Sequence, residues 1–307
     1  MKNHLVFALM MFLVQSVSAQ KVELIVLGTL QDGGMPHIGC EQKVCRELIQ
    51  HPDPAKKVVS LGLIDHDYQK NYLFEATPDI SSQLSLLKEY SPFQKDKIPN
   101  GIFLTHAHMG HYTGLLQLGK EALDAKSETV FAMPKMKSFL ESNQPWSMLI
   151  DQKNIQVESL ENETPKQLTP NINVIPVLVP HRDELSETVG YKIVGPNKTV
   201  LFIPDINKWS LWDKDILTQI KAVDYAFIDA TFFDNSEVGY RDLSQIPHPF
   251  VIESMDLLNN LSKSDKEKIY FIHFNHTNPL VDLQSLPSKK VKSAGFQIAR
   301  VGMQLEL

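Results

Sequence analysis

Three histidines lie close together in the sequence, directly after an apolar stretch. They are His106, His108 and His111, and they follow residues 101–104, which are predicted to form a buried strand. Neutral imidazole is the commonest nitrogen ligand of zinc and related metals. A strand end followed by a turn lets side chains at positions i, i+2 and i+5 converge on one point. We therefore interpret the three histidines as part of a metal site.

Other polar residues end further predicted strands. His181, Asp205, Asp229 and His273 each follow an apolar run. An aspartate at a strand end usually belongs to a turn, so none of these residues is informative alone. Because all of them end strands, they can face one edge of the sheets together with the histidine cluster. Their joint occurrence predicts one shared metal site.

The elements that must position these residues are short strands with helices between them. The predicted strands cover residues 22–27, 57–64, 71–75, 102–104, 130–133, 154–157, 172–179, 188–194, 199–203, 225–228, 269–272 and 297–301, and the predicted helices cover 80–90, 113–123, 209–220 and 250–261. The sequence shows no long linker, internal repeat or low-complexity tract. This pattern predicts one α/β domain over residues 20–307, with helices that cover the sheets.

The composition restricts the class of substrate. The chain has 307 residues, of which 43% are hydrophobic and 21% are charged, as in an ordinary globular protein. The formal net charge is −6, and no long run of lysine or arginine occurs. Nucleic acid is therefore not an expected partner. We expect a small-molecule substrate, and the sequence leaves the oligomeric state open.

The first 19 residues have the pattern of a secretory signal peptide. A short basic start is followed by an apolar core over residues 5–14 and by small residues before Gln20. The apolar core is too short for a membrane-spanning helix of about 20 residues. We expect an exported protein, periplasmic or secreted, that begins near Gln20 and keeps no stable membrane anchor after cleavage. An uncleaved N-terminal anchor is the alternative.

The two cysteines of the chain, Cys40 and Cys45, lie five positions apart. In an oxidising compartment they can form a disulfide. They can also form half of a structural metal site, for which His37 is the nearest further ligand. Free thiols are the third possibility. The sequence alone leaves all three open.

The order of the candidate ligands resembles the metallo-β-lactamase superfamily, whose members carry a His-x-His-x-Asp-His motif in an αββα sandwich. The resemblance implies a single domain of this fold. It also implies two metal positions that share one aspartate. In this chain the first position would comprise His106, His108 and His181, the second His111 and His273, and the shared residue Asp205.

Further segments are similar to one branch of the superfamily, pyrroloquinoline-quinone biosynthesis protein B and its relatives. These segments are residues 27–29, 33–34, 76–79, 189–191, 203–205, 232–234, 247–249 and 275–279. The resemblance extends from about residue 22 to the end of the chain. Members of that biosynthesis branch often lack the first two histidines of the motif, whereas this chain keeps His106 and His108. This difference favours an active hydrolase.

One departure from the superfamily motif concerns the second metal position. The motif's aspartate is replaced by Gly110, which has no side chain and cannot be a ligand. We therefore expect one firmly held metal and a weakened second position. Zinc is the expected metal, and iron and manganese suit the same ligands. His276 is expected to be an exposed loop residue rather than a replacement ligand.

The predicted ligands indicate a hydrolase. A zinc ion held by three nitrogens lowers the pKa of bound water from about 15.7 to about 7 and so supplies metal-bound hydroxide. Asp205 would be the catalytic carboxylate that orients this hydroxide or takes its proton. Asp79 and Asp229 are the carboxylates expected to orient ligand imidazoles. The role of His248 is open.

The predicted function is metal-dependent hydrolysis of a small ester, lactone, cyclic phosphodiester or amide. Two alternatives remain. One is an enzyme similar to pyrroloquinoline-quinone biosynthesis protein B. The other is a metal-binding homologue that has lost catalysis.

Overall fold

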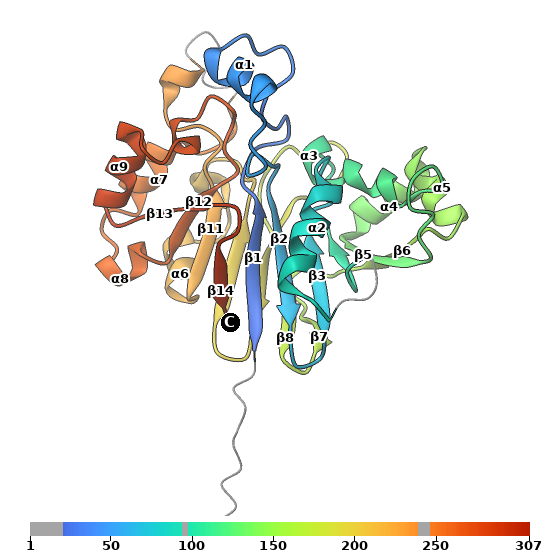
Figure 1. Cartoon of the computed structure of the whole chain (residues 1–307). Helices are drawn as coiled ribbons and strands as arrows, with labels where there is room; N and C mark the ends of the chain where they lie inside the picture. Colours follow the sequence, from blue (N-terminus) through green and yellow to red (C-terminus); the bar gives the residue numbers. More distant parts are fainter. Residues whose placement is uncertain (1–20, 94–97, 239–245) are drawn as a thin grey trace, which may run out of the picture.

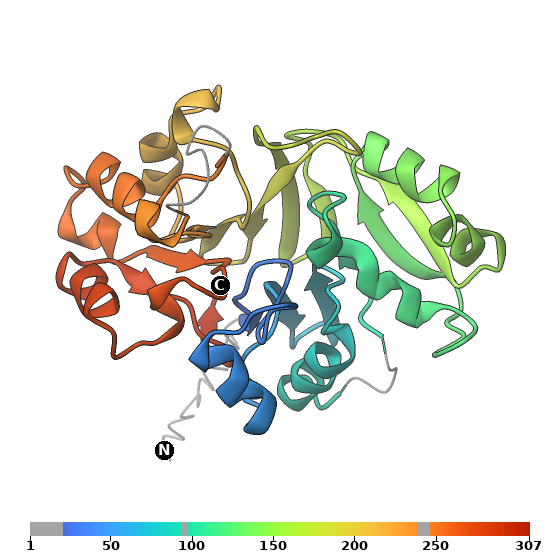
Figure 2. The ribbon, with the colours of Figure 1, turned by 90° about the horizontal axis from the view of Figure 1, so that it is seen from above.

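Two β-sheets face each other between outer layers of helices in the computed structural model (Figure 1, Figure 2). The structure describes residues 21–93, 98–238 and 246–307, and structural statements below refer to these residues. The arrangement confirms the predicted αββα sandwich and the α/β class. The predicted signal peptide, residues 1–19, lies outside the described residues and stays a prediction.

Each sheet has seven strands in its described part, and neighbours along the chain are mostly neighbours in space. The first sheet has the order β14 (Gln304–Glu306), β1 (Val22–Gly28), β2 (Ser60–Asp65), β3 (Lys70–Phe74), β4 (Ile102–Phe103), β5 (Glu128–Ala132) and β6 (Ile155–Ser159). The second has the order β13 (Gln297–Ile298), β12 (Ile269–Ile272), β11 (Tyr225–Asp229), β10 (Thr199–Ile203), β9 (Val189–Val194), β8 (Ile172–Leu178) and β7 (Lys166–Thr169). The predicted strands 57–64 and 71–75 correspond to β2 and β3, which form an antiparallel pair.

The helices cover the outer faces of both sheets (Figure 1). On the side of the first sheet lie α2 (Ile80–Tyr90), α3 (Met109–Tyr112), η1 (Thr113–Leu118), α4 (Pro134–Ser142) and α5 (Trp146–Asp151). On the other side lie η2 (Trp209–Leu211), α6 (Ile216–Lys221), η3 (Asn235–Glu237), α7 (Val251–Leu257), α8 (Lys263–Lys266), η5 (Pro279–Val281) and α9 (Leu286–Ser293), and α1 (Lys43–Gln50) lies above the first strand. Among these described helices, none is long and apolar enough to cross a membrane.

An aromatic core holds the two sheets together. Phe74 and Phe103 of the first sheet stack at 4.9 Å between ring centroids. The Tyr191 ring of the second sheet packs edge-on against both, and Phe202 packs against Phe74. These side chains are fully buried, and large buried aromatic rings contribute much of the apolar area that stabilises a core. The core fixes the two sheets relative to each other, and with them the strand ends that carry the site.

The strand ends meet at one edge of the sandwich. Strands β10, β11 and β12 run parallel, so their carboxyl ends lie side by side. Asp205, Asp229 and His273 occupy these ends. In the first sheet β3, β4 and β5 are also parallel, and His106 follows β4. The predicted convergence of strand-end residues is confirmed.

Two predicted helices are shorter or interrupted. The predicted helix 113–123 is the 3₁₀ helix η1, which ends at Leu118, because Gly114 N donates to Ala76 O at 2.8 Å and ties the segment to the loop after β3. The predicted helix 209–220 is split into η2 and α6. The Asp215 carboxylate accepts hydrogen bonds from Leu217 N and Thr218 N and so starts a new helix there.

Other boundaries also differ from the sequence prediction. The predicted helix 250–261 ends at Leu257 in α7, and the predicted strand 297–301 is only the two-residue strand β13. The sequence prediction did not include α1, α3, α4, α5, α8, α9, η3, η5, β7 or β14. These elements are short, and their apolar periods are too brief to separate a helix or strand from a loop.

Candidate metal centre

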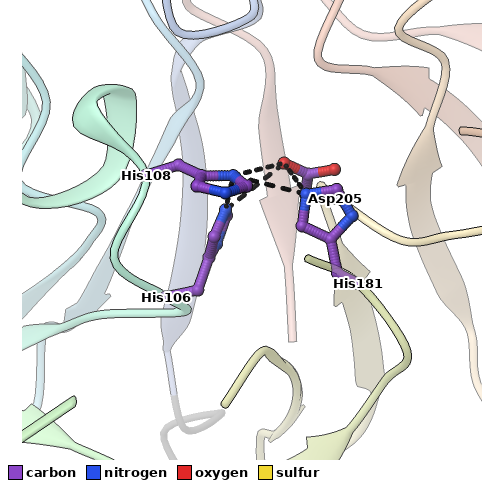
Figure 3. Close-up of side chains that lie close together, drawn as sticks. All are labelled: His106, His108, His181 and Asp205. Carbon is purple, nitrogen blue, oxygen red and sulfur yellow. Dashed lines mark hydrogen bonds and ion pairs between the residues drawn. The ribbon is translucent and has the colours of Figure 1, made fainter. Parts of the chain in front are cut away.

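Four of the predicted ligands form a first group at the edge of the sandwich (Figure 3). His106 Nε2 lies 2.8 Å from His108 Nδ1, and His108 Nδ1 lies 3.3 Å from His181 Nε2. Asp205 Oδ2 lies 3.4 Å from His106 Nε2 and 3.3 Å from His181 Nε2. The four candidate ligand atoms all lie within 4.8 Å of one another. We refer to His106, His108, His181 and Asp205 as the first group.

A second group lies beside the first and consists of Asp32, His111 and His273. Asp32 Oδ1 is 2.9 Å from His111 Nε2 and 3.8 Å from His273 Nε2. Asp205 Oδ2 is 3.9 Å from His111 Nε2. The Asp205 carboxylate therefore lies against both groups. This is the position expected for the shared ligand that we predicted.

Gly110 faces Asp32 across a very short distance. A Cβ atom on Gly110 would lie 2.4 Å from Asp32 Oδ1 and 2.5 Å from Asp32 Cα. Asp32 thus lies beside His111 and His273, where the sequence analysis expected the carboxylate of the motif to be missing. The carboxylate comes from the loop after β1, in which the sequence analysis named no ligand.

Acceptor groups set the orientation of the histidine rings. His181 Nδ1 lies 3.1 Å from Asn207 Oδ1, and His111 Nδ1 lies 3.3 Å from Glu75 Oε1. An amide carbonyl oxygen only accepts hydrogen bonds, so the His181 ring carries its hydrogen on Nδ1, whereas His111 and Glu75 are in ion-pair contact. The His181 Nε2 atom then presents a lone pair to the centre, which is the tautomer that a metal ion requires.

Two threonines make the equivalent contacts to the other rings. Thr105 Oγ1 is 2.9 Å from His106 Nδ1. Thr231 Oγ1 is 2.9 Å from His273 Nδ1, and because this hydroxyl donates to Asp229 Oδ1 it is free to accept from the ring. Each of the four rings is thus fixed from behind, with Nε2 toward the centre.

His108 is oriented the other way, with Nδ1 toward the centre. Its Nε2 lies 3.2 Å from a guanidinium nitrogen of Arg182. Because Arg182 can only donate, the ring accepts that hydrogen bond. A positive charge therefore lies at the exposed side of the first group.

Several buried polar atoms at the centre have no hydrogen-bond partner. They include Asp32 Oδ1, His111 Nε2 and His273 Nε2. A buried polar group without a partner costs about 1–3 kcal/mol. The three atoms belong to neighbouring side chains and lie on the same side of the second group, where one cation would satisfy all of them. The residues that are present fit a bound metal ion.

The surrounding charges keep the carboxylates of the centre ionised. Burial would raise the pKa of Asp205, but the charges of His181 and His248 hold it well below its ordinary value. Burial likewise opposes ionisation of Asp32, and His111 and His273 hold the pKa of that carboxyl low. A pair of ionised carboxylates at a buried site is a strong attractant for a divalent cation.

The same charges act on the imidazoles. Burial lowers the pKa of His106 well below its ordinary value, so this ring is neutral and able to act as a ligand. Burial also opposes protonation of His111, but Glu75 and Asp32 raise its pKa well above the ordinary value. Protonated His111 cannot bind a metal, so a metal bound at this ring would displace a proton.

Two residues of the centre have left-handed backbone conformations. Glu75 has a φ of 75° directly after β3, and His273 has a φ of 70° directly after β12. Such conformations cost non-glycine residues about 1–3 kcal/mol and concentrate at functional sites. Here each left-handed conformation directs the side chain of a strand-end residue toward the centre.

Two acidic residues predicted to orient ligand imidazoles have different roles. Asp79 Oδ2 accepts a hydrogen bond from Val58 N at 2.8 Å and so holds the loop before β2. Asp229 Oδ2 lies 2.8 Å from His248 Nδ1, and Asp229 Oδ1 accepts from Thr231. Asp229 therefore acts on the centre through these two neighbours.

His248, whose role the sequence left open, lies against the centre. Its Nδ1 is 3.1 Å from Asp205 Oδ1. Burial opposes protonation of this ring, but Asp229 and Asp205 raise its pKa to about 10. His248 is therefore a cation that balances two buried carboxylates.

Sequence reasoning missed several residues of the centre, namely Asp32, Glu75, Thr105, Asn207 and Thr231. Each of them lies within a few residues of the end of a strand, where the predicted ligands also lie. Asp32 and Glu75 carried the clearest available signal, because both are acidic residues at or just after a predicted strand.

The two cysteines form a disulfide in the structure, which is one of the three predicted possibilities. His276 stacks on His37 at 4.2 Å between ring centroids. It lies next to Cys40 and Cys45 and is half-buried rather than exposed. His276 thus belongs to the disulfide region and is not a member of either ligand group.

Comparison with known families agrees with this geometry. Residues 70–274 match the model of the beta-lactamase superfamily domain. The chain therefore belongs to the metallo-β-lactamase superfamily, as the motif resemblance predicted.

Two similar proteins are coenzyme PQQ synthesis proteins B. That of Methylococcus capsulatus is 23% identical, with 92% of this chain and 99% of the relative covered. That of Acinetobacter baylyi is 25% identical, with 92% and 99% covered. The predicted resemblance to this branch is confirmed.

Solved structures show the same fold. Zinc-bound PqqB from Methylobacterium extorquens superimposes with a TM-score of 0.74 at 20% identity, over 93% of this chain and all of that one. A diphosphatase from the PhnP family gives a TM-score of 0.61 at 22% identity, over 94% and 97% of the two chains.

We predict that Asn207→Leu weakens zinc binding about 10- to 100-fold, because His181 loses the acceptor that fixes its ring and tautomer. Zinc affinity is measured by competition with a chromophoric chelator. The matched control is Asn259→Leu, whose exposed amide accepts from Lys266 outside the centre. Equal zinc affinities for both variants would contradict the orienting role of Asn207.

Proposed function

We propose that this protein is a metal-dependent hydrolase of a small ester, lactone, cyclic phosphodiester or amide, with zinc as the metal. The observation that carries the proposal is that ring nitrogens of His106, His108 and His181 converge on Asp205 Oδ2. The other nitrogen of each ring contacts Thr105, Arg182 and Asn207, respectively. A cluster arranged only for stability would have no need to direct three ring nitrogens at one carboxylate oxygen.

The residues of the first group would hold the ion: His106 and His181 through Nε2, His108 through Nδ1, and Asp205 through Oδ2. Zinc in such a site supplies a Lewis acid that lets water react near neutral pH. Asp205 is 2% exposed and ionised, so it is suited to orient an attacking water molecule or to accept its proton.

Arg182 favours substrates that carry an anionic group. When His108 binds through Nδ1, its hydrogen is on Nε2, and that nitrogen no longer accepts from Arg182. The guanidinium is then free at the exposed side of the centre, where it can pair with a phosphodiester or carboxylate oxygen. Within the proposed set of substrates, we therefore favour those with a negative charge.

A second candidate function is a role similar to that of PQQ synthesis protein B. The similarity to those relatives over 92% of this chain favours it. It is tested by asking whether this chain restores cofactor formation in a strain that lacks its own PQQ synthesis protein B. Restoration without turnover of any hydrolase substrate would favour this candidate, and metal binding with neither activity would favour a non-catalytic homologue.

We predict that the protein binds at least one equivalent of zinc. The zinc-loaded protein should hydrolyse at least one member of a panel of small esters, lactones, cyclic phosphodiesters and amides. His181→Ala should then lower turnover by at least about 100-fold, because it removes a first-group nitrogen. His51→Ala, at an exposed position after α1, is the matched control. The hydrolase proposal is wrong if the protein binds less than one equivalent and His106→Ala leaves that value unchanged.

Arg182→Ala should raise KM for anionic substrates about tenfold, the effect of one charge-assisted hydrogen bond, and leave neutral substrates nearly unaffected. The exposed Arg300→Ala is the control for loss of surface charge. Steady-state kinetics with paired charged and neutral substrates measures the difference. Equal effects on both substrates would exclude a role in recognition of an anion.

We also propose that the protein is exported, on the basis of the signal-peptide pattern in residues 1–19. Mass spectrometry of protein from cell fractions should find a mature N-terminus near Gln20 in the periplasm or medium. An intact Met1 terminus in the cytoplasm would refute export, and an intact terminus in the membrane fraction would indicate an uncleaved anchor.

A further inference from the structure

The carboxylate of the second group is supplied by a different chain segment from its histidines. Asp32 follows β1, His111 lies in α3, and His273 follows β12. Asp32 Oδ1 lies 2.9 Å from His111 Nε2, yet the two atoms have no hydrogen-bond partner. Their contact is therefore an approach of two ligand atoms without hydrogen-bond geometry between them.

The backbone holds Asp32 and His273 together. Leu30 forms a parallel bridge with Phe274, the residue after His273. Gln31 N donates to Phe274 O at 2.8 Å, and Phe274 N donates to Thr29 O at 2.8 Å. Since these hydrogen bonds flank both side chains, the loop after β1 is fixed in register with the strand end that carries His273. The position of Asp32 is thus built into the fold.

Space, and not backbone conformation, requires a glycine at position 110. Gly110 lies in the short helix α3, a conformation that any residue adopts. A Cβ atom there would lie 2.5 Å from Asp32 Cα and 2.9 Å from Asp32 Cβ. A Cα atom cannot move aside as a flexible side-chain end can. Asp32 therefore occupies the space that a side chain at position 110 would fill.

We propose that Asp32 is the carboxylate ligand of a second metal ion, held with His111, His273 and the shared Asp205, and that Gly110 is the steric counterpart of this ligand. The proposal rests on the metal-dependent function proposed above. Two imidazoles and two carboxylates suit zinc, manganese or iron. The carboxylate that the motif lacks is thereby replaced from the N-terminal loop, and the centre holds two ions.

The test exchanges the carboxylate between the two positions. Zinc alone is the probe, and the equivalents bound per chain are measured by elemental analysis after equilibrium dialysis. The full protein should bind two equivalents. Asp32→Ala should bind one, with the affinity for the second ion at least about 10- to 100-fold weaker.

Gly110→Asp alone should also bind fewer than two equivalents, because its side chain collides with Asp32. The double variant Asp32→Gly, Gly110→Asp should regain the second equivalent, since the carboxylate returns to the motif position with space to fit. Asp256→Ala removes an equal charge from the exposed face of α7 and should still bind two. Asp32→Asn keeps the side-chain shape and replaces Asp32→Ala if that variant does not fold.

The outcomes separate this inference from the proposed function. One equivalent in the full protein, or two in Asp32→Ala, would overturn the role of Asp32 while the first group and the hydrolase proposal stand. A full protein that binds no zinc would overturn both. A gain of an ion in Gly110→Asp alone would show that position 110 has space for a ligand and would also overturn the inference.

Discussion

The buried negative charge of Asp205 is the constraint on which the rest of the centre depends. An ionised carboxylate that is 2% exposed is stable only when positive charge or hydrogen-bond donors lie against it. In this chain the groups that face it are imidazoles, which are also metal ligands. His248 supplies part of the balancing charge from one side. On the other side, the converging ring nitrogens leave a position that suits a divalent cation.

The architecture serves this constraint by bringing the ends of strands from both sheets together. The aromatic core of Phe74, Phe103 and Tyr191 sets the spacing of the sheets. The parallel strands β10, β11 and β12 then deliver Asp205, Asp229 and His273 to one edge. The left-handed conformations of Glu75 and His273 add the final change of direction. The core between the sheets thus stabilises the fold, and these two left-handed residues complete the placement of the side chains at the centre.

The sequence predicted the fold and most of the candidate ligands because both depend on patterns that lie close together in the chain. Apolar runs ending in His181, Asp205 and His273 are visible without coordinates, and so is the histidine cluster. Helices such as α8 and α9 were not predicted because their apolar faces are too short to produce a clear period. The break between η2 and α6 depends on the cap at Asp215, which competes with an otherwise continuous helical pattern.

Asp32 was missed for a different reason. Gly110, which lies against it in the structure, is 78 positions away (110 − 32). A single sequence does not show which distant residues lie next to each other in the fold. The absence of a side chain at Gly110 looked like the loss of a ligand. In the structure the same absence provides the space that Asp32 occupies. A position that looks empty in the sequence motif can therefore lie against a carboxylate from a distant segment.

In our proposal, strand-end residues from distant segments form one centre with two metal positions joined by Asp205. Anomalous diffraction from crystals of the zinc-loaded protein tests it most directly. We predict two zinc peaks, one among His106, His108 and His181 and one among Asp32, His111 and His273, with Asp205 between them. A single peak at the first group, with Asp32 outside bonding distance of any ion, would contradict the account.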